Sequence, residues 1–165
     1  VNKSNNEVKL LLVGKDSADI KTGAPSTWEL MKLLFNQSSI KKVEYFGAVA
    51  YSKIQDLIKE ATVCVFPTFA EALPLSWLEA MSMEKAIVAS NIGWAEEMIE
   101  NKKEGFLVNP TNHAQYAECI LDLLNDSKKQ ELYGKAAREK VESQFSQKLI
   151  AKRSIEFYKK IIESC

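Results

Sequence analysis

The strongest constraint on the fold is a regular alternation of short apolar segments with longer amphipathic ones. The apolar segments are rich in valine, isoleucine, leucine and phenylalanine, and they span residues 8–13, 43–46, 63–66, 86–89 and 106–108. Such runs are typical of strands buried on both faces of a parallel sheet. Because parallel strands need crossover connections, we expect helices between them. The sequence therefore predicts an α/β fold, a parallel sheet with helices on both faces.

Capping signals indicate where several of these helices begin. Ser26 with Glu29 three residues later matches a capping box, and apolar residues continue at helical spacing as far as Phe35. Pro74 suits the first turn of another helix. Two more helical patterns span residues 52–61 and 95–100.

The chain beyond Pro110 contains no further apolar strand and is expected to be helical. Three amphipathic segments follow there. Ser127 and Ser146 are expected to start the second and third of them as caps. We expect the apolar side of the last segment to dock on this domain or on a missing one.

Composition excludes several classes of function. The 22 basic and 22 acidic residues balance, whereas a surface that follows nucleic acid normally shows a basic excess. Cys64, Cys119 and Cys165 form no CxxC pair, which argues against a disulfide framework or structural zinc and favours a reducing, cytoplasmic setting. No run approaches the ~20 apolar residues that a membrane span needs.

The loop after the third apolar segment is the part of the chain that most suggests chemistry. Ligands of open parallel sheets bind at the carboxyl ends of the strands. The free N–H groups of Leu75 and Ser76 would point out of the open end of the next helix, which favours an anion such as a diphosphate. Glu71 in the loop and Glu79 on the helix would flank that anion, and each carboxylate can accept hydrogen bonds from a sugar diol.

The two glutamates also have an ordinary structural interpretation. Paired glutamates around a helix start are common, and most of them are solvated or help to cap the helix. The spacing of Glu71 and Glu79 by itself favours this structural role over any ligand.

Several short blocks of sequence agree in order and spacing with one enzyme family. They are residues 66–71 with Glu79, Ala80 and Met81, residues 86–90, Gly93 with Glu97, and residues 105–108. Together with residues 43–47 and 52–61, these blocks resemble the C-terminal domain of family 4 retaining glycosyltransferases. The resemblance implies one half of a GT-B architecture, in which two Rossmann-like domains enclose the active site.

The resemblance also implies roles for particular residues. Glu71 matches the glutamate that lies against the donor hexose and the reacting centre, and Glu79 matches the one that binds the ribose hydroxyls. The diphosphate position corresponds to Pro74, Leu75 and Ser76. The loop that borders the nucleobase corresponds to Gly47, Ala48 and Val49. No metal or cofactor is implied, because basic side chains and the helix end would neutralise the departing diphosphate.

The sequence departs from the family pattern at three places. Glycines are common where Ala72 and Pro74 stand, so here a methyl group intrudes and one N–H is missing. Trp94 replaces the second glycine of a Gly-Gly pair. The family's basic pair, which lies on and just after an earlier strand, would precede Val1. We therefore expect residues 1–165 to be a donor-binding domain that lacks its first strand and the N-terminal acceptor domain.

The expected function is binding of a nucleoside-diphosphate sugar for retaining hexosyl transfer in polysaccharide or glycolipid assembly. A saccharide or lipid-linked acceptor would bind through the missing N-terminal domain, and any membrane contact would also use that half. The setting is expected to be cytoplasmic or at the inner membrane face, and the isolated chain is expected to be inactive.

Two alternatives stay open. A nucleotide-sugar epimerase shares the GT-B architecture, although the sequence offers no convincing acid or base for it. A non-catalytic nucleotide- or sugar-binding module would account for the departures at Ala72, Pro74 and Trp94.

Overall fold

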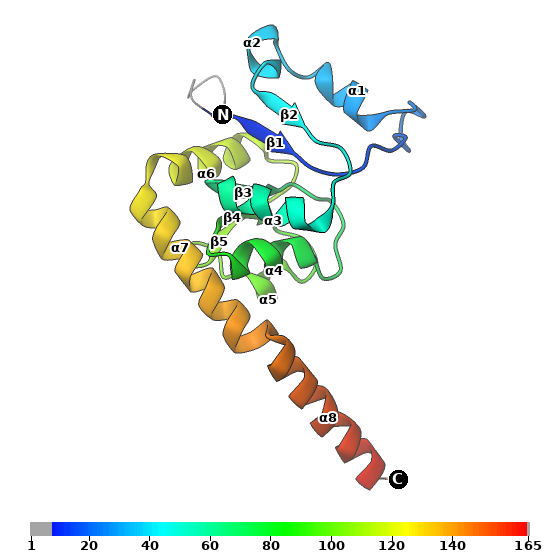
Figure 1. Cartoon of the computed structure of the whole chain (residues 1–165), viewed down its shortest axis with the longest axis vertical. Helices are drawn as coiled ribbons and strands as arrows, with labels where there is room; N and C mark the ends of the chain where they lie inside the picture. Colours follow the sequence, from blue (N-terminus) through cyan, green and yellow to red (C-terminus); the bar gives the residue numbers. More distant parts are fainter. Residues whose placement is uncertain (1–7, 165) are drawn as a thin grey trace. The chain divides into compact units, whose positions relative to one another are not determined.

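Two compact units follow each other along the chain. A computed structural model describes residues 8–164, of which those up to Glu60 form the first unit and those from Ala61 onward form the second. Each unit contains parallel strands with helices in the connections between them (Figure 1). The parallel α/β organisation predicted from the alternating segments is confirmed.

The first unit is built on a two-stranded parallel sheet, in blue and cyan in Figure 1. Strand β1 (Leu10–Leu12) pairs with β2 (Val43–Tyr45), with Leu10 opposite Val43. The helices of this unit are α1 (Thr27–Lys32), α2 (Gln37–Ile40) and α3 (Tyr51–Glu60). Both strands are only partly buried, and Leu10 is 38% exposed. The predicted burial on both faces is therefore wrong for these strands, because two short strands give each other few neighbours.

Side-chain caps set the helix boundaries in the first unit. Ser26 Oγ accepts the N–H of Glu29 at 3.0 Å, which confirms the predicted start of α1. The helix ends at Lys32, so Leu34 is 85% exposed and does not extend the apolar face as predicted. Asn36 then caps α2, a helix that the apolar spacing did not predict. An asparagine cap thus interrupts a pattern that would otherwise read as one longer helix.

The second unit is built on a three-stranded parallel sheet with β4 at its centre. The strands are β3 (Val63–Phe66), β4 (Ala86–Ser90) and β5 (Gly105–Val108). The helices are α4 (Leu75–Ser82), α5 (Ala95–Met98), α6 (His113–Asn125), α7 (Ser127–Lys140) and α8 (Gln147–Glu163), with a π-helical turn at Val141–Phe145 between the last two.

Helices cover both faces of this sheet. Every residue of β4 and β5 is buried. Ala86 and Val88 join a core cluster with Tyr116 of α6 and Tyr133 of α7. Ile87 points to the opposite face and is also fully buried, and α4 contacts β4. The predicted two-sided burial is therefore confirmed for β4 and β5, whereas in the outer strand β3 only Cys64 is buried.

A close backbone contact braces the end of α4 against α7. A Cβ atom placed at Gly134 would lie 2.1 Å from the carbonyl oxygen of Glu84, so only glycine permits this approach. The Arg138 guanidinium also donates to the carbonyl oxygen of Ser82, the last residue of α4. These two contacts fix the C-terminal end of the helix that carries Glu79.

The C-terminal helices begin with caps that differ from the predicted ones. Asp126, one residue before Ser127, accepts the N–H of Lys129 at 2.9 Å and caps α7. Ser146 stands at the cap position of α8, but its side chain makes no capping hydrogen bond. The aspartate takes the role predicted for Ser127, because its side chain reaches the third N–H of the same turn.

Helix α8 presents an unpaired apolar side. Its residues 151–163 are all exposed, including Ile155, Tyr158 and Ile162; the helix is drawn in orange and red in Figure 1. Of the two expected alternatives, docking on the present domain is therefore wrong for residues 151–163, and docking on a further domain stays a prediction. Within residues 8–164, none of the helices has the length and apolar content needed to cross a membrane.

Candidate functional site

The connection from β3 to α4 ends in an open helix terminus. Pro74 is buried and takes the cap position with φ −73° and ψ 102°, one residue before the first helical residue. It has no side-chain capping bond, and its carbonyl accepts the N–H of Trp77 at 3.1 Å. The side chains of Leu75 and Ser76 are exposed. The first N–H groups of a helix lack acceptors within it, and a helix end of this kind favours an anion.

The two predicted carboxylates lie on either side of this helix terminus along the chain. Glu79 is half-buried and follows Leu75 by four residues, so both side chains share one face of α4. Glu71 lies in the loop before the helix and is exposed. The structure therefore places Glu71, Pro74, Leu75 and Glu79 along one continuous segment.

A glycine after β4 supports the backbone at Glu71. A Cβ atom at Gly93 would lie 3.4 Å from the carbonyl oxygen of Glu71, and Gly93 has φ +49°, which glycine adopts without strain. Trp94 follows, is 61% exposed and stands at the cap position of α5. The loops after β3 and β4 thus contact each other next to Glu71.

The predicted nucleobase loop belongs to the first unit, after β2. Gly47 has φ +63°, and its carbonyl oxygen accepts the N–H of Gly14 at 3.0 Å. Gly47 and Val49 are half-buried, whereas Ala48 is exposed. The carboxyl ends of β1 and β2 are therefore joined by a hydrogen bond between their loops.

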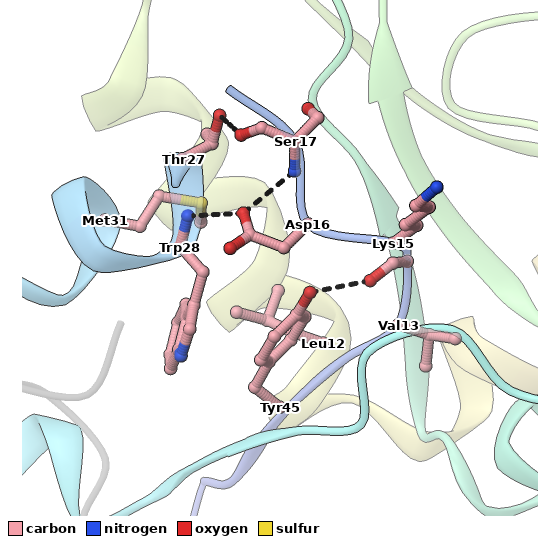
Figure 2. A pocket seen from close by; sticks show the side chains of 10 residues that line it. Leu12, Val13, Lys15, Asp16, Ser17, Thr27, Trp28, Met31 and Tyr45 are labelled. Atoms are coloured by element: carbon pink, nitrogen blue, oxygen red, sulfur yellow. Dashed lines mark hydrogen bonds between the residues drawn. The ribbon is translucent and has the colours of Figure 1, made fainter. Parts of the chain in front are cut away.

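A pocket of about 200 Å³ opens beside this junction (Figure 2). Its walls are formed by Leu12, Val13, Gly14, Lys15, Asp16, Ser17, Thr27, Trp28, Met31 and Tyr45. The ring centroids of Trp28 and Tyr45 are 4.7 Å apart, and the Tyr45 hydroxyl donates to the carbonyl of Gly14 at 2.8 Å. No local sequence pattern predicted this pocket, because its walls come from segments ten or more positions apart in the chain.

Asp16 organises the rim of that pocket. Its carboxylate accepts hydrogen bonds from the hydroxyl of Ser26 at 2.5 Å and from the N–H groups of Trp28 and Ser17, each at 3.0 Å. The bond from Ser26, followed by the one from Trp28, lowers the pKa of Asp16 below its ordinary value. The carboxylate of Asp16 is thus engaged in hydrogen bonds to its own loop and to the start of α1.

Other reactive groups are inert or absent from the described part of the chain. Burial raises the pKa of the Cys64 thiol to about 11, which disfavours the reactive thiolate. No group of three or more metal-ligating side chains occurs within residues 8–164. Over the same range, Thr68 Oγ1 and Trp77 Nε1 are buried without a hydrogen-bond partner. Both lie on the β3–α4 segment that carries Glu71.

Comparison with known proteins identifies the family. A family model described as "Glycosyl transferases group 1" matches residues 1–140. The chain belongs to this family. Its relatives include the alpha-maltose-1-phosphate synthase of Mycolicibacterium smegmatis, which is 36% identical over 115 residues, covering 66% of this chain and 30% of the relative.

A second relative of this group 1 glycosyltransferase chain has a longer match. It is the N,N'-diacetylbacillosaminyl-diphospho-undecaprenol alpha-1,3-N-acetylgalactosaminyltransferase of Campylobacter jejuni, 32% identical over 123 residues. The match covers 74% of this chain and 32% of the relative. The chain thus spans about a third of the length of these relatives.

Solved glycosyltransferase structures share the fold of this group 1 chain. A glycosyltransferase from Rickettsia africae matches with a TM-score of 0.79 and 27% identity, covering 99% of this chain and 43% of the other. The Anabaena protein HepE, solved in complex with UDP, matches with a TM-score of 0.83 and 23% identity, covering 94% and 42%. The α/β, Rossmann-like fold is therefore that of GT-B glycosyltransferases.

Proposed function

We propose that this chain is the donor-binding domain of a retaining family 4 glycosyltransferase and binds a nucleoside-diphosphate sugar at the N-terminus of α4. The single observation that carries the proposal is the exposed end of α4, which has no side-chain cap and stands between Glu71 and Glu79. An uncapped helix start offers N–H donors and a positive dipole end to a diphosphate.

Each residue of this segment has a defined task in the proposal. The N–H groups of Leu75 and Ser76 bind the diphosphate and stabilise its growing charge as the glycosidic bond breaks. Glu79, one turn further along the same face, accepts hydrogen bonds from the ribose hydroxyls. Glu71 orients the hexose and stabilises positive charge near the anomeric carbon. No metal or cofactor is required for these tasks.

The comparisons support the donor class. HepE has been solved with UDP, with UDP and glucose, and with UDP-glucose, so uridine is the first base to test. The names of the two curated relatives specify alpha-configured products. Retention of configuration is the stereochemical course that gives such products from an alpha-linked nucleotide sugar.

The complete enzyme requires a second surface for the acceptor. Since the chain spans about a third of its relatives, we propose that a further domain binds a saccharide or lipid-linked acceptor. The Campylobacter relative's name contains such a lipid diphosphate. The exposed apolar side of α8 is available to pack against that domain. The setting would be the cytoplasm or the inner membrane face.

Calorimetric titration with UDP, GDP and ADP tests the donor site. We expect saturable binding of one nucleotide and, for Glu79→Gln, roughly tenfold weaker binding, because one charge-assisted hydrogen bond contributes about 1.5–3 kcal/mol. The matched control is Glu139→Gln, an exposed glutamate of α7, which should bind as the wild type does. Equal losses in both variants would refute the role of Glu79.

A further inference from the structure

The hydroxyl of Tyr116 lies between the carboxyl ends of two strands. Tyr116 belongs to α6 and is 6% exposed. Its oxygen is 2.8 Å from Ser90 Oγ and 3.3 Å from the carbonyl oxygen of Phe66. Phe66 is the last residue of β3 and Ser90 is the last residue of β4. One phenol therefore contacts the ends of both strands.

The proton positions in this network follow from the acceptor at Phe66. A carbonyl oxygen can only accept, so the Tyr116 O–H donates to it. Since the phenol has one proton, Ser90 must donate its hydroxyl proton to the Tyr116 oxygen. Burial raises the pKa of Tyr116 above its ordinary value, which keeps the donating proton in place. Ser90 is fully buried and relies on this contact.

The two strand ends lead directly into the loops of the candidate site. The residue after Phe66 begins the connection that contains Glu71. Ser90 is followed by the turn to Gly93, against which the carbonyl oxygen of Glu71 rests. The hydroxyl of Tyr116 thus links the residues at which these two loops begin. The same two loops contact each other at Gly93 and Glu71.

We infer that Tyr116 is a positioning residue for the donor sugar, because its hydroxyl ties the roots of the Glu71 loop and the Gly93 loop together. The inference rests on the proposed function. The ring of Tyr116 packs in the core cluster, and a phenylalanine would keep that packing. The hydroxyl is therefore the part of the side chain that acts on the site.

The first test is amide hydrogen exchange of the wild-type chain, Tyr116→Phe and Tyr133→Phe. Tyr133 is the matched control, a tyrosine of the same core cluster with similar burial. We expect about fivefold faster exchange in residues 68–73 and 91–94 of Tyr116→Phe only, the effect of losing one buried hydrogen bond. Unchanged exchange there, or an equal increase across β3–β5, would overturn the inference.

The second test compares binding of UDP with binding of UDP-glucose. For Tyr116→Phe, we expect UDP affinity to stay within twofold of wild type, because α4 and Glu79 are retained, while UDP-glucose binds about fivefold more weakly. Equal loss for both ligands would overturn the positioning role. If the wild-type chain binds no nucleotide, the proposed function fails, and the donor role of Tyr116 fails with it. The exchange result alone then decides whether the hydroxyl ties the two loops.

Discussion

Single residues determine how closely the elements around the candidate site approach one another. Gly134 lets α7 pass the carbonyl oxygen of Glu84, and Gly93 lets the loop after β4 lie on the backbone of Glu71. Asp16 plays a comparable part in the first unit, where it joins two segments ten or more residues apart. Each of these contacts can be removed by one substitution.

Gly134→Ala tests the contact between α7 and the turn after α4. In an unhindered helix this change would stabilise the protein by about 1 kcal/mol. Here the new Cβ atom would meet the Glu84 carbonyl oxygen at 2.1 Å, so we expect a net loss of about 1–3 kcal/mol. Thermal unfolding measures this loss of stability. An unchanged or higher midpoint would contradict the close approach of Gly134 to Glu84.

Asp16→Asn tests the pH dependence of the first unit. Because hydrogen bonds from Ser26 and Trp28 lower the folded-state pKa of Asp16, its stabilisation is present above the unfolded pKa and is lost as pH falls through the folded one. We expect the variant to be less stable than wild type at pH 6, and the two to converge as pH falls through the lowered folded-state pKa of Asp16. Urea unfolding across this range checks it, with Asp56→Asn on α3 as control. A constant difference would argue against the assigned role.

At the scale of elements, local sequence patterns predicted the types of structure well and their partners poorly. All five strands and the capped start of α1 were predictable, because alternating apolar runs and a Ser–Glu cap are local signals. The partial burial of β1 and β2 was not, since burial depends on which strands pair. The cap at Asp126 and the separate cap of α2 at Asn36 were also missed, because several neighbouring residues could serve as caps and the sequence does not show which side chain accepts the N–H groups.

In the candidate site, too, local features were predictable from the sequence and contacts between distant residues were not. The open end of α4 followed from Pro74 and the helical pattern after it, and the structure confirms an uncapped start. The contact of Gly93 with Glu71 and the bridge made by Tyr116 join residues 20 to 50 positions apart. No local pattern could predict them.

At the scale of the whole molecule, α8 is the element that the present chain leaves unpaired. Its apolar residues are exposed although they lie on one side of a regular 17-residue helix. A chain that spans about a third of its relatives leaves room for a domain that would cover this side. Under the proposed function, a further domain that packs on α8 would bury this apolar side.

Ile155→Glu tests whether the apolar side of α8 is covered by a further domain or stays exposed in the full-length protein. In the present chain Ile155 is 55% exposed, so we expect its stability to change by less than about 0.5 kcal/mol. In the full-length protein the same change should cost about 2 kcal/mol or more, because a charge would be buried at the interface. Thermal unfolding of both forms provides the measurement. Equal small effects in both would show that α8 stays exposed.

The central claim is that the N-terminus of α4 binds the diphosphate of a nucleotide sugar. The most direct measurement is the backbone amide shift of Leu75 and Ser76 in an NMR titration with UDP, compared with uridine. We expect large saturable shifts of both amides with UDP and small shifts with uridine, since only UDP carries the anion. Saturable UDP binding that leaves these two amides unchanged would contradict it.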